Sequence, residues 1–104
     1  LARDAGFTAV FCMSDIMAVG AMRALTDAGL RVPQDISVLG FDGIELGQYA
    51  VPRLATVSQP QQEIADQSVA LLLGQIEKAA PPQTRVVSTG LLEGESVASV
   101  TSDI

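Results

Sequence analysis

The sequence predicts an α/β fold built on a parallel sheet, on three observations. Two short apolar runs, residues 8–13 and 36–41, flank a stretch of helical periodicity at 14–28, which is the spacing of a strand-helix-strand unit. Along the whole chain, apolar runs and helical stretches follow the order strand, helix, strand, strand, helix, strand. Hydrophobic residues make up 48% of the 104 residues and charged residues 17%, so the composition is that of a folded domain rather than a disordered chain.

The first strand and helix have clear local signals. Residues 1–6 resemble the end of a helix stopped by Gly6, and the apolar run 8–13 is typical of a buried parallel strand. Ser14 or Asp15 can cap the amino end of the following helix. Gly29 ends that helix in the usual position for a glycine stop.

The second and third strands follow a turn and a short connection. The run 36–41 is apolar and partly β-branched, and Asp42 and Gly43 after it form a turn signal. Residues 44–50 are weakly helical. Residues 54–57 predict a short third strand.

A long helix and a last strand complete the pattern. Ser58 with Gln61 three residues later resembles a helix-capping pair, and helical periodicity continues to about Lys78. Residues 84–92 are strand-like, with a glycine interruption. From Glu93 onward the chain is polar and small, so we expect a loosely held tail.

The composition excludes several classes of function. The net charge of −6 disfavours a direct grip on nucleic acid, and the chain has no histidine for a nucleophile's base or a histidine zinc site. The single cysteine, Cys12, lies in an apolar run, where it is typical of a small buried residue, and a reducing compartment suits it. No apolar run is long enough to span a membrane, and no phosphate-binding glycine loop is present. We therefore expect no enzyme activity, no metal and no cofactor.

Two carboxylates and one hydroxyl are the candidate site. Asp15 follows the first strand and Asp42 ends the second, so parallel pairing would place both at the carboxyl edge of the sheet, where α/β proteins hold ligands. Asp42 is suited to accept hydrogen bonds from neighbouring hydroxyls of a sugar or nucleoside. The alternatives are a turn-forming role for Asp42 and helix capping for Ser14 and, chiefly, for Asp15. A hydrolase using the two acids is the least favoured interpretation.

Ordered motifs along nearly the whole chain resemble one family. They are TAVFCMSDIMAVGAMRAL (8–25), GLRVPQDISVLGFDG (29–43), YAVPRLATVSQP (49–60), EIADQSVALLLGQI (63–76) and LLEGESV (91–97). The ordered set resembles the carboxyl-terminal part of the effector-binding domain of lactose-repressor and galactose-repressor type transcription regulators. Two positions depart from the family pattern: Ala55 replaces a usual threonine, and Gly94, followed by Glu95, replaces a common arginine. These departures bear on the contacts expected of the terminal strand, not on the family.

The resemblance implies specific roles for residues of this chain. Asp42 would contact the effector, with Ser14 and Asp15 beside it. The helix 16–28 and the segment 48–54 would lie at a two-fold dimer interface, which would also account for the apolar composition. The interface residues that we expect are Ile16, Val19, Gly20, Arg23, Tyr49 and Val51.

The resemblance also implies a domain organisation and a function. The fold would be a three-layer, periplasmic-binding-protein-like sandwich, present here mostly as one lobe. Residues 1–58 and 84–98 would form that lobe and its crossovers, the helix at 59–80 would pack on a second lobe elsewhere, and 99–104 would be a tail. The expected function is ligand sensing and dimerisation in a cytoplasmic regulator that binds operator DNA through a helix-turn-helix outside this chain. The alternative is a piece of a periplasmic solute-binding protein for a sugar transporter.

Overall fold

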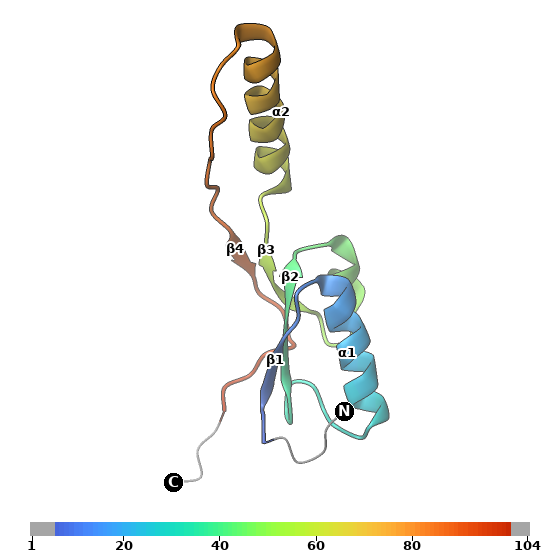
Figure 1. The fold of residues 1–104 in the computed structure, drawn as a ribbon. Helices are drawn as coiled ribbons and strands as arrows, with labels where there is room; N and C mark the ends of the chain where they lie inside the picture. Colours follow the sequence, from blue (N-terminus) through green and yellow to red (C-terminus); the bar gives the residue numbers. More distant parts are fainter. Residues whose placement is uncertain (1–5, 101–104) are drawn as a thin grey trace. The chain divides into compact units, whose positions relative to one another are not determined.

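The computed structural model describes residues 6–100, and its elements follow the predicted order (Figure 1). The predicted helix end at residues 1–5 and the last part of the predicted tail, 101–104, lie outside the described residues. The elements are β1 (Ala9–Phe11), α1 (Asp15–Asp27), β2 (Ser37–Asp42), the 3-10 helix η1 (Glu45–Tyr49), β3 (Ala55–Ser58), α2 (Gln61–Lys78) and β4 (Gly90–Leu92). The α/β class is confirmed.

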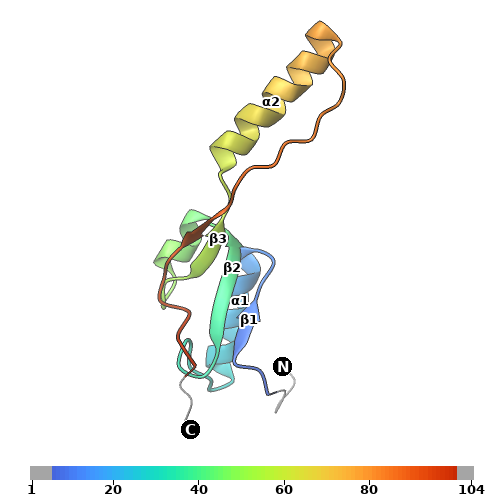
Figure 2. The same ribbon diagram turned by 90° about the vertical axis from the view of Figure 1, so that its left-hand side faces the viewer.

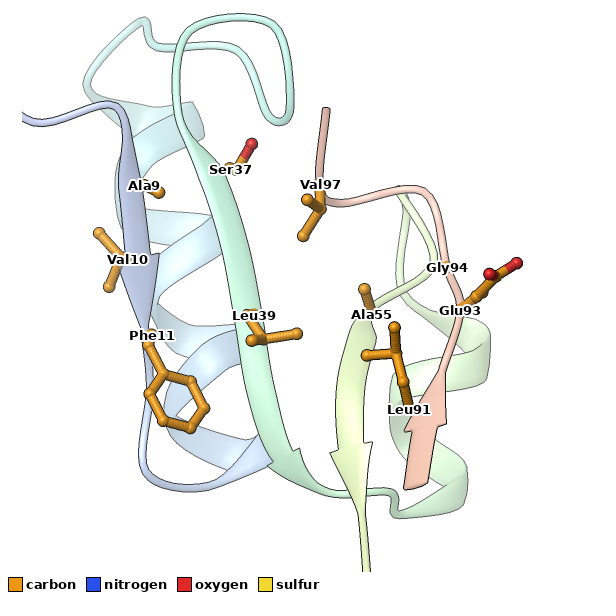
Figure 3. A pocket seen from close by; sticks show the side chains of 10 residues that line it. All are labelled: Ala9, Val10, Phe11, Ser37, Leu39, Ala55, Leu91, Glu93, Gly94 and Val97. Carbon is orange, nitrogen blue, oxygen red and sulfur yellow. The ribbon is translucent and has the colours of Figure 1, made fainter. Parts of the chain in front are cut away.

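The strands form one sheet in the order β1, β2, β3, β4. β1 pairs with β2 in parallel, with Val10 opposite Val38, and β2 pairs with β3 in parallel, with Asp42 opposite Ser58. β4 runs in the opposite direction beside β3 (Figure 3), so the sheet is mixed rather than wholly parallel. The parallel core of the prediction is confirmed for the first three strands.

Helix α1 covers one face of this sheet (Figures 1 and 2). Because successive side chains of a strand point to opposite faces, alternate residues of β2 and β3 face the helix. Val38 and Thr56 are buried there, and Leu54, immediately before β3, is buried with them. Each fully buried leucine or methionine contributes on the order of 1.5–3 kcal/mol through its removal from water. The buried apolar cluster consists of Ala18, Met22, Leu25, Ile36, Val38 and Leu54.

The ends of α1 show which of the two predicted caps is used. The Ser14 hydroxyl accepts a hydrogen bond from the Met17 amide at 3.2 Å and caps the helix. The interpretation of Asp15 chiefly as a cap is wrong, since its carboxylate bonds to groups outside the helix. Gly29, with φ of 82°, follows the last turn as predicted, in a conformation that glycine adopts without strain.

The turn before β2 is closed by an ion pair between Arg31 and Asp35 and by two backbone hydrogen bonds to the Arg31 carbonyl. Asp35 accepts hydrogen bonds from the Arg31 amide at 2.7 Å and from the Arg31 guanidinium at 3.0 and 3.1 Å. These bonds hold the pKa of the Asp35 carboxyl below its usual range. The pair shapes the loop that delivers the chain into β2.

Two predictions around the second helix are wrong. Ser58 is not a helix cap: it ends β3, and α2 begins after Pro60 without any side-chain cap. The strand predicted at 84–92 is present only as β4, at the end of that range. Residues 84–89 have no neighbouring strand within residues 6–100 with which their backbone could pair. The predicted end of α2 at Lys78 is confirmed, with Ala79 in a left-handed conformation after it.

The segment that follows β4 is firmly held, at variance with the loosely held tail predicted from Glu93 onward. The buried Ser96 hydroxyl donates to the Val38 carbonyl at 2.6 Å and accepts from the Ala55 amide at 2.8 Å. The Ser96 carbonyl accepts from the Val38 amide at 2.8 Å. The Glu95 amide donates to the Arg53 carbonyl at 2.7 Å, and the Ala98 amide donates to the Ser37 hydroxyl at 3.0 Å. The buried Ser96 and the backbone of this segment therefore hydrogen-bond to strands, although most of its other side chains are exposed.

The chain divides into two compact units. One comprises Leu1–Ser58 with Leu91–Ile104, and the other Gln59–Gly90. Helix α2 belongs to the second unit and buries none of its residues. No helix in residues 6–100 is both long and apolar enough to cross a membrane.

Candidate functional site

Three strands deliver polar side chains to one edge of the sheet. Ser14 follows β1, Asp42 ends β2 and Ser58 ends β3, and the three strands are parallel. The Cys12 amide donates to the Leu39 carbonyl at 2.8 Å, which continues the pairing of the first two strands toward this edge. Ser14, Asp42 and Ser58 are all half-buried. The topology thus brings together two of the predicted site residues with one that was predicted as a helix cap.

Asp15 lies beneath this edge rather than on it. Its side chain is fully buried, and one carboxylate oxygen accepts from the amides of Gly43 at 2.9 Å and Ile44 at 2.7 Å. The other oxygen accepts from the Thr56 hydroxyl at 2.5 Å. A buried carboxylate is stable when such donors surround it. Asp15 therefore joins the start of α1, the turn after β2 and the strand β3.

The backbone at Asp42 has an unusual conformation. Its φ is 126°, in the region that side-chain-bearing residues rarely adopt, and Gly43 follows with φ of 83°. A Cβ on Gly43 would lie 2.9 Å from the Ser58 Cβ. Glycine is required at 43 both for its φ and for the close approach of β3. Residues in such strained conformations cluster at functional sites.

The sequence did not reveal two residues that surround the Asp15 carboxylate, Thr56 and Gly40. Thr56 is a polar residue on the side of β3 that faces the helix, next to the apolar Leu54 on the same side. A single polar residue on a buried face indicates that it has a hydrogen-bond partner there. Gly40 leaves the space: a Cβ there would lie 2.3 Å from the Asp15 carboxylate oxygen. Both signals become readable only once the strand register is known.

The face of the sheet opposite α1 carries an apolar groove of about 620 Å³ (Figure 3). Phe11 and Phe41 meet edge to face on this side, with ring centroids 6.4 Å apart. The groove is lined almost entirely by carbon atoms, so it does not offer the polar groups that a sugar requires. Its lining residues are Ala9, Val10, Phe11, Ser37, Leu39, Ala55, Leu91, Glu93, Gly94 and Val97.

The predicted interface residues are mostly exposed. Ile16 is 69% exposed, Tyr49 72% and Val51 96%, and helix α1 contacts η1. Gly20 and Arg23 are also exposed, with Arg23 paired to Asp27 at 3.1 Å along the helix. Val19 is half-buried and packs against the core. The exposed members give α1 and η1 an apolar surface that water does not favour.

The site contains no grouping suited to a metal. Within residues 6–100, no three histidine, cysteine, aspartate or glutamate side chains gather as a metal ion would require. Partial burial raises the pKa of the Cys12 thiol, which keeps it protonated and unreactive near neutral pH. The chemistry that the edge offers is hydrogen bonding.

Comparison with known proteins gives one consistent result. Residues 2–97 match the periplasmic binding protein-like domain family. The chain is 48% identical over 92 residues to the HTH-type transcriptional repressor PurR of Yersinia enterocolitica, covering 88% of this chain and 27% of the relative. It thus spans about a quarter of the length of that curated relative.

Solved structures agree with the sequence comparison. A LacI family transcriptional regulator from Enterococcus faecalis V583 with bound ribose has a TM-score of 0.87 and 29% identity, over 94% of this chain and 37% of that one. The lac repressor dimer bound to operator and the anti-inducer ONPF has a TM-score of 0.81 and 35% identity, over 88% of this chain and 32% of that one. The chain therefore belongs to the periplasmic binding protein-like domain family, within the effector-binding domains of the lactose-repressor and galactose-repressor regulators.

Proposed function

We propose that this chain is the effector-sensing and dimerising part of a DNA-binding transcription regulator. The observation that carries the proposal is Asp42, which ends the central strand β2 in a strained backbone conformation at the edge where three parallel strands finish. Open α/β sheets bind ligands at this edge. Effector binding would shift the equilibrium between a form that binds the operator and a form that does not. The size of the shift is limited by the difference between the effector's affinities for these two forms.

The effector in this proposal is a sugar, a nucleoside or a similar polar metabolite. The Asp42 carboxylate would accept hydrogen bonds from two neighbouring hydroxyls, and the Ser14 hydroxyl would supply a second contact in addition to its capping bond. Asp15 would support the site without touching the effector, since its side chain is buried and its carboxylate bonds to Gly43, Ile44 and Thr56. The structure of a relative with bound ribose supports this ligand class.

Dimerisation would use the exposed apolar surface of α1 and η1. Ile16 on α1 and Tyr49 on η1 are exposed, Val51 just beyond η1 is exposed as well, and α1 and η1 are in contact. The surface would also include Val19, Gly20 and Arg23. A two-fold axis would bring the same patch of two subunits together. The dimeric lac repressor among the similar structures supports this arrangement.

Helix α2 would pack on a second lobe of the complete gene product. Its residues Val69, Leu72 and Ile76 are 56%, 57% and 69% exposed, and it buries none of its side chains within the described chain. Exposed apolar stripes of this kind mark contact surfaces. Without that lobe, we expect the chain to self-associate at high concentration, which light scattering would detect.

The proposal places the protein in the cytoplasm, where its target DNA would be, and assigns it no enzyme activity. DNA binding would come from a separate helix-turn-helix, because a net charge of −6 repels a phosphate backbone. The similarity to the repressor PurR and to the operator-bound lac repressor supports the regulator over the alternative, a periplasmic solute-binding protein.

The test is the variant Asp42→Ala in the complete gene product. Calorimetry with a panel of pentoses, hexoses and nucleosides identifies the ligand of the unaltered protein. We expect Asp42→Ala to weaken that binding at least about 100-fold, since two charge-assisted hydrogen bonds are lost, and to leave operator affinity in the absence of ligand unchanged.

The matched control is Asp66→Ala, which removes an exposed carboxylate on α2 that accepts a hydrogen bond from the Gln62 side chain of the same helix at 2.9 Å. Ligand affinity should be unchanged in this variant. Equal affinity of Asp42→Ala and the unaltered protein for the ligand would refute the assignment of Asp42.

A further inference from the structure

The buried Asp15 carboxylate connects three separate elements of the fold. It stands at the first residue of α1 and accepts from the backbone after β2 and from the Thr56 side chain of β3. Both oxygens are occupied and no part of the side chain reaches solvent. Capping does not explain this arrangement, because Ser14 caps the helix.

The site around this carboxylate is built to receive it. Gly40 on β2 leaves the volume that one carboxylate oxygen occupies, since a Cβ there would approach that oxygen to 2.3 Å. Thr56 supplies a hydroxyl on the same buried face. Packing alone would be served by an apolar residue at 15, so the polar surroundings indicate that the bonds themselves matter.

The position that these bonds control lies next to Asp42. The amides of Gly43 and Ile44 are the two groups directly after it in the chain, and both are fixed on the same Asp15 oxygen at 2.9 and 2.7 Å. On its other side, Asp42 is in register with Ser58. A φ of 126° at Asp42 persists only where the surroundings over-determine it.

We propose that Asp15 is a positioning residue, whose carboxylate fixes the backbone at Gly43 and Ile44 and thereby holds Asp42 in its strained conformation. The consequence for ligand binding rests on the proposed function, in which Asp42 contacts the effector. In this mechanism Asp15 sets the effector affinity without touching the effector. Rotation of Asp42 toward the extended conformation would move its side chain away from its place at the edge.

The test uses nuclear magnetic resonance on the 104-residue chain, at a concentration below that at which light scattering detects self-association. The three-bond coupling between the amide and α protons of Asp42 is small at φ near 126° and large in extended backbone, so it reports the proposed effect directly. In Asp15→Ala we expect this coupling to rise to the extended value. The amides of Gly43 and Ile44 should exchange with solvent about 10-fold faster or more, because their acceptor is gone.

The conservative variant separates positioning from packing. In Asp15→Asn, the amide oxygen can accept from Gly43 and Ile44 while the amide nitrogen donates to the Thr56 hydroxyl. We expect the Asp42 coupling to be retained and the two amides to exchange less than about fivefold faster. An Asp42 coupling that stays small in Asp15→Ala would overturn the proposal.

Gly40→Ala decides the matter if Asp15→Ala does not fold. It keeps the carboxylate but displaces it, so the Asp42 coupling should rise as in the alanine variant, whereas an unchanged coupling would overturn the positioning role. Gly20→Ala, the same change where nothing lies within 4 Å, is the control and should leave the coupling unchanged. These readouts need no ligand, so they are independent of the effector measurements on Asp42→Ala.

Discussion

Ser96 illustrates how a single buried hydroxyl joins strands that are distant in sequence. It lies where β2 and β3 diverge, below their first paired residues, Leu39 and Ala55. Its side chain accepts from the Ala55 amide and donates to the Val38 carbonyl, across 41 and 58 residues of chain. Without it, these two buried backbone groups would lack a partner at the fork of the sheet.

Replacement of Ser96 by alanine should therefore destabilise the chain by about 1–3 kcal/mol, since it leaves buried backbone groups unpaired. Urea unfolding followed by circular dichroism would measure the loss. Ser99→Ala, a few residues along on the exposed part of the same segment, should change the free energy of unfolding by less than about 0.5 kcal/mol. Equal losses in the two variants would contradict the role given to Ser96.

The roles of individual residues were predictable where their partners are local. The Ser14 cap and the Gly29 stop depend on neighbours within one helical turn, and both were read from the sequence. Asp15 was misjudged because an acid at a helix start fits a cap, whereas its partners Gly43 and Thr56 are 28 and 41 residues away. Ser96 was missed for the same reason.

At the scale of elements, the order of helices and strands followed from the sequence, and their ends followed only in part. Helix α1 and β2 have strong boundaries, with a cap, a glycine stop and an Asp-Gly turn. Ser58 was wrongly predicted as a helix cap because the residues around it resemble a capping pair. The local pattern does not contain the strand register that pairs Ser58 with Asp42. The length of β4 was overestimated because residues 84–89 have a strand-forming composition but pair with no strand within residues 6–100.

Helix α1 carries a prediction that separates stability from association. Gly20 has open space around its Cα, so Gly20→Ala should stabilise the isolated helix by about 0.8–1.0 kcal/mol. The added methyl would obstruct close approach of a second subunit at the proposed α1 surface. We expect a higher melting temperature for the 104-residue chain and a dimer dissociation constant at least about 10-fold higher for the complete gene product.

Calorimetry and sedimentation equilibrium would measure the two effects. Gly74→Ala on α2 is the matched control, since its Cβ would make an ordinary 3.8 Å contact with Ala80 and lies off the proposed surface. Dimerisation unaltered by Gly20→Ala would argue against the placement of α1 at the interface.

At the scale of the whole molecule, the chain leaves the sheet after β3 and returns at β4. The excursion Gln59–Gly90 forms its own compact unit, and β3 and β4 are neighbours in the sheet. The first unit is therefore formed by two stretches of the chain that are separated in the sequence by the second unit. Its closing contacts come from the segment 94–98.

Replacement of Gln59–Gly90 by a four-residue glycine-rich turn should leave the first unit folded. The connection is shortened by about three successive halvings, which lowers the entropic cost of closing this loop by roughly 2 kcal/mol. The free energy of unfolding should therefore not fall. Thermal unfolding should show one cooperative transition. Loss of that transition would mean that the excursion is required for the sheet.

The position of Ser96 also has a consequence during synthesis. The Ala55 amide emerges from the ribosome 41 residues before the hydroxyl that satisfies it. At about 5–20 residues per second, this delay is roughly 2–8 s, during which the fork between β2 and β3 has no partner from the same chain. The sheet of each nascent polypeptide is thus exposed to chaperones, or to a neighbouring nascent chain, until the segment after β4 that carries Ser96 has been made.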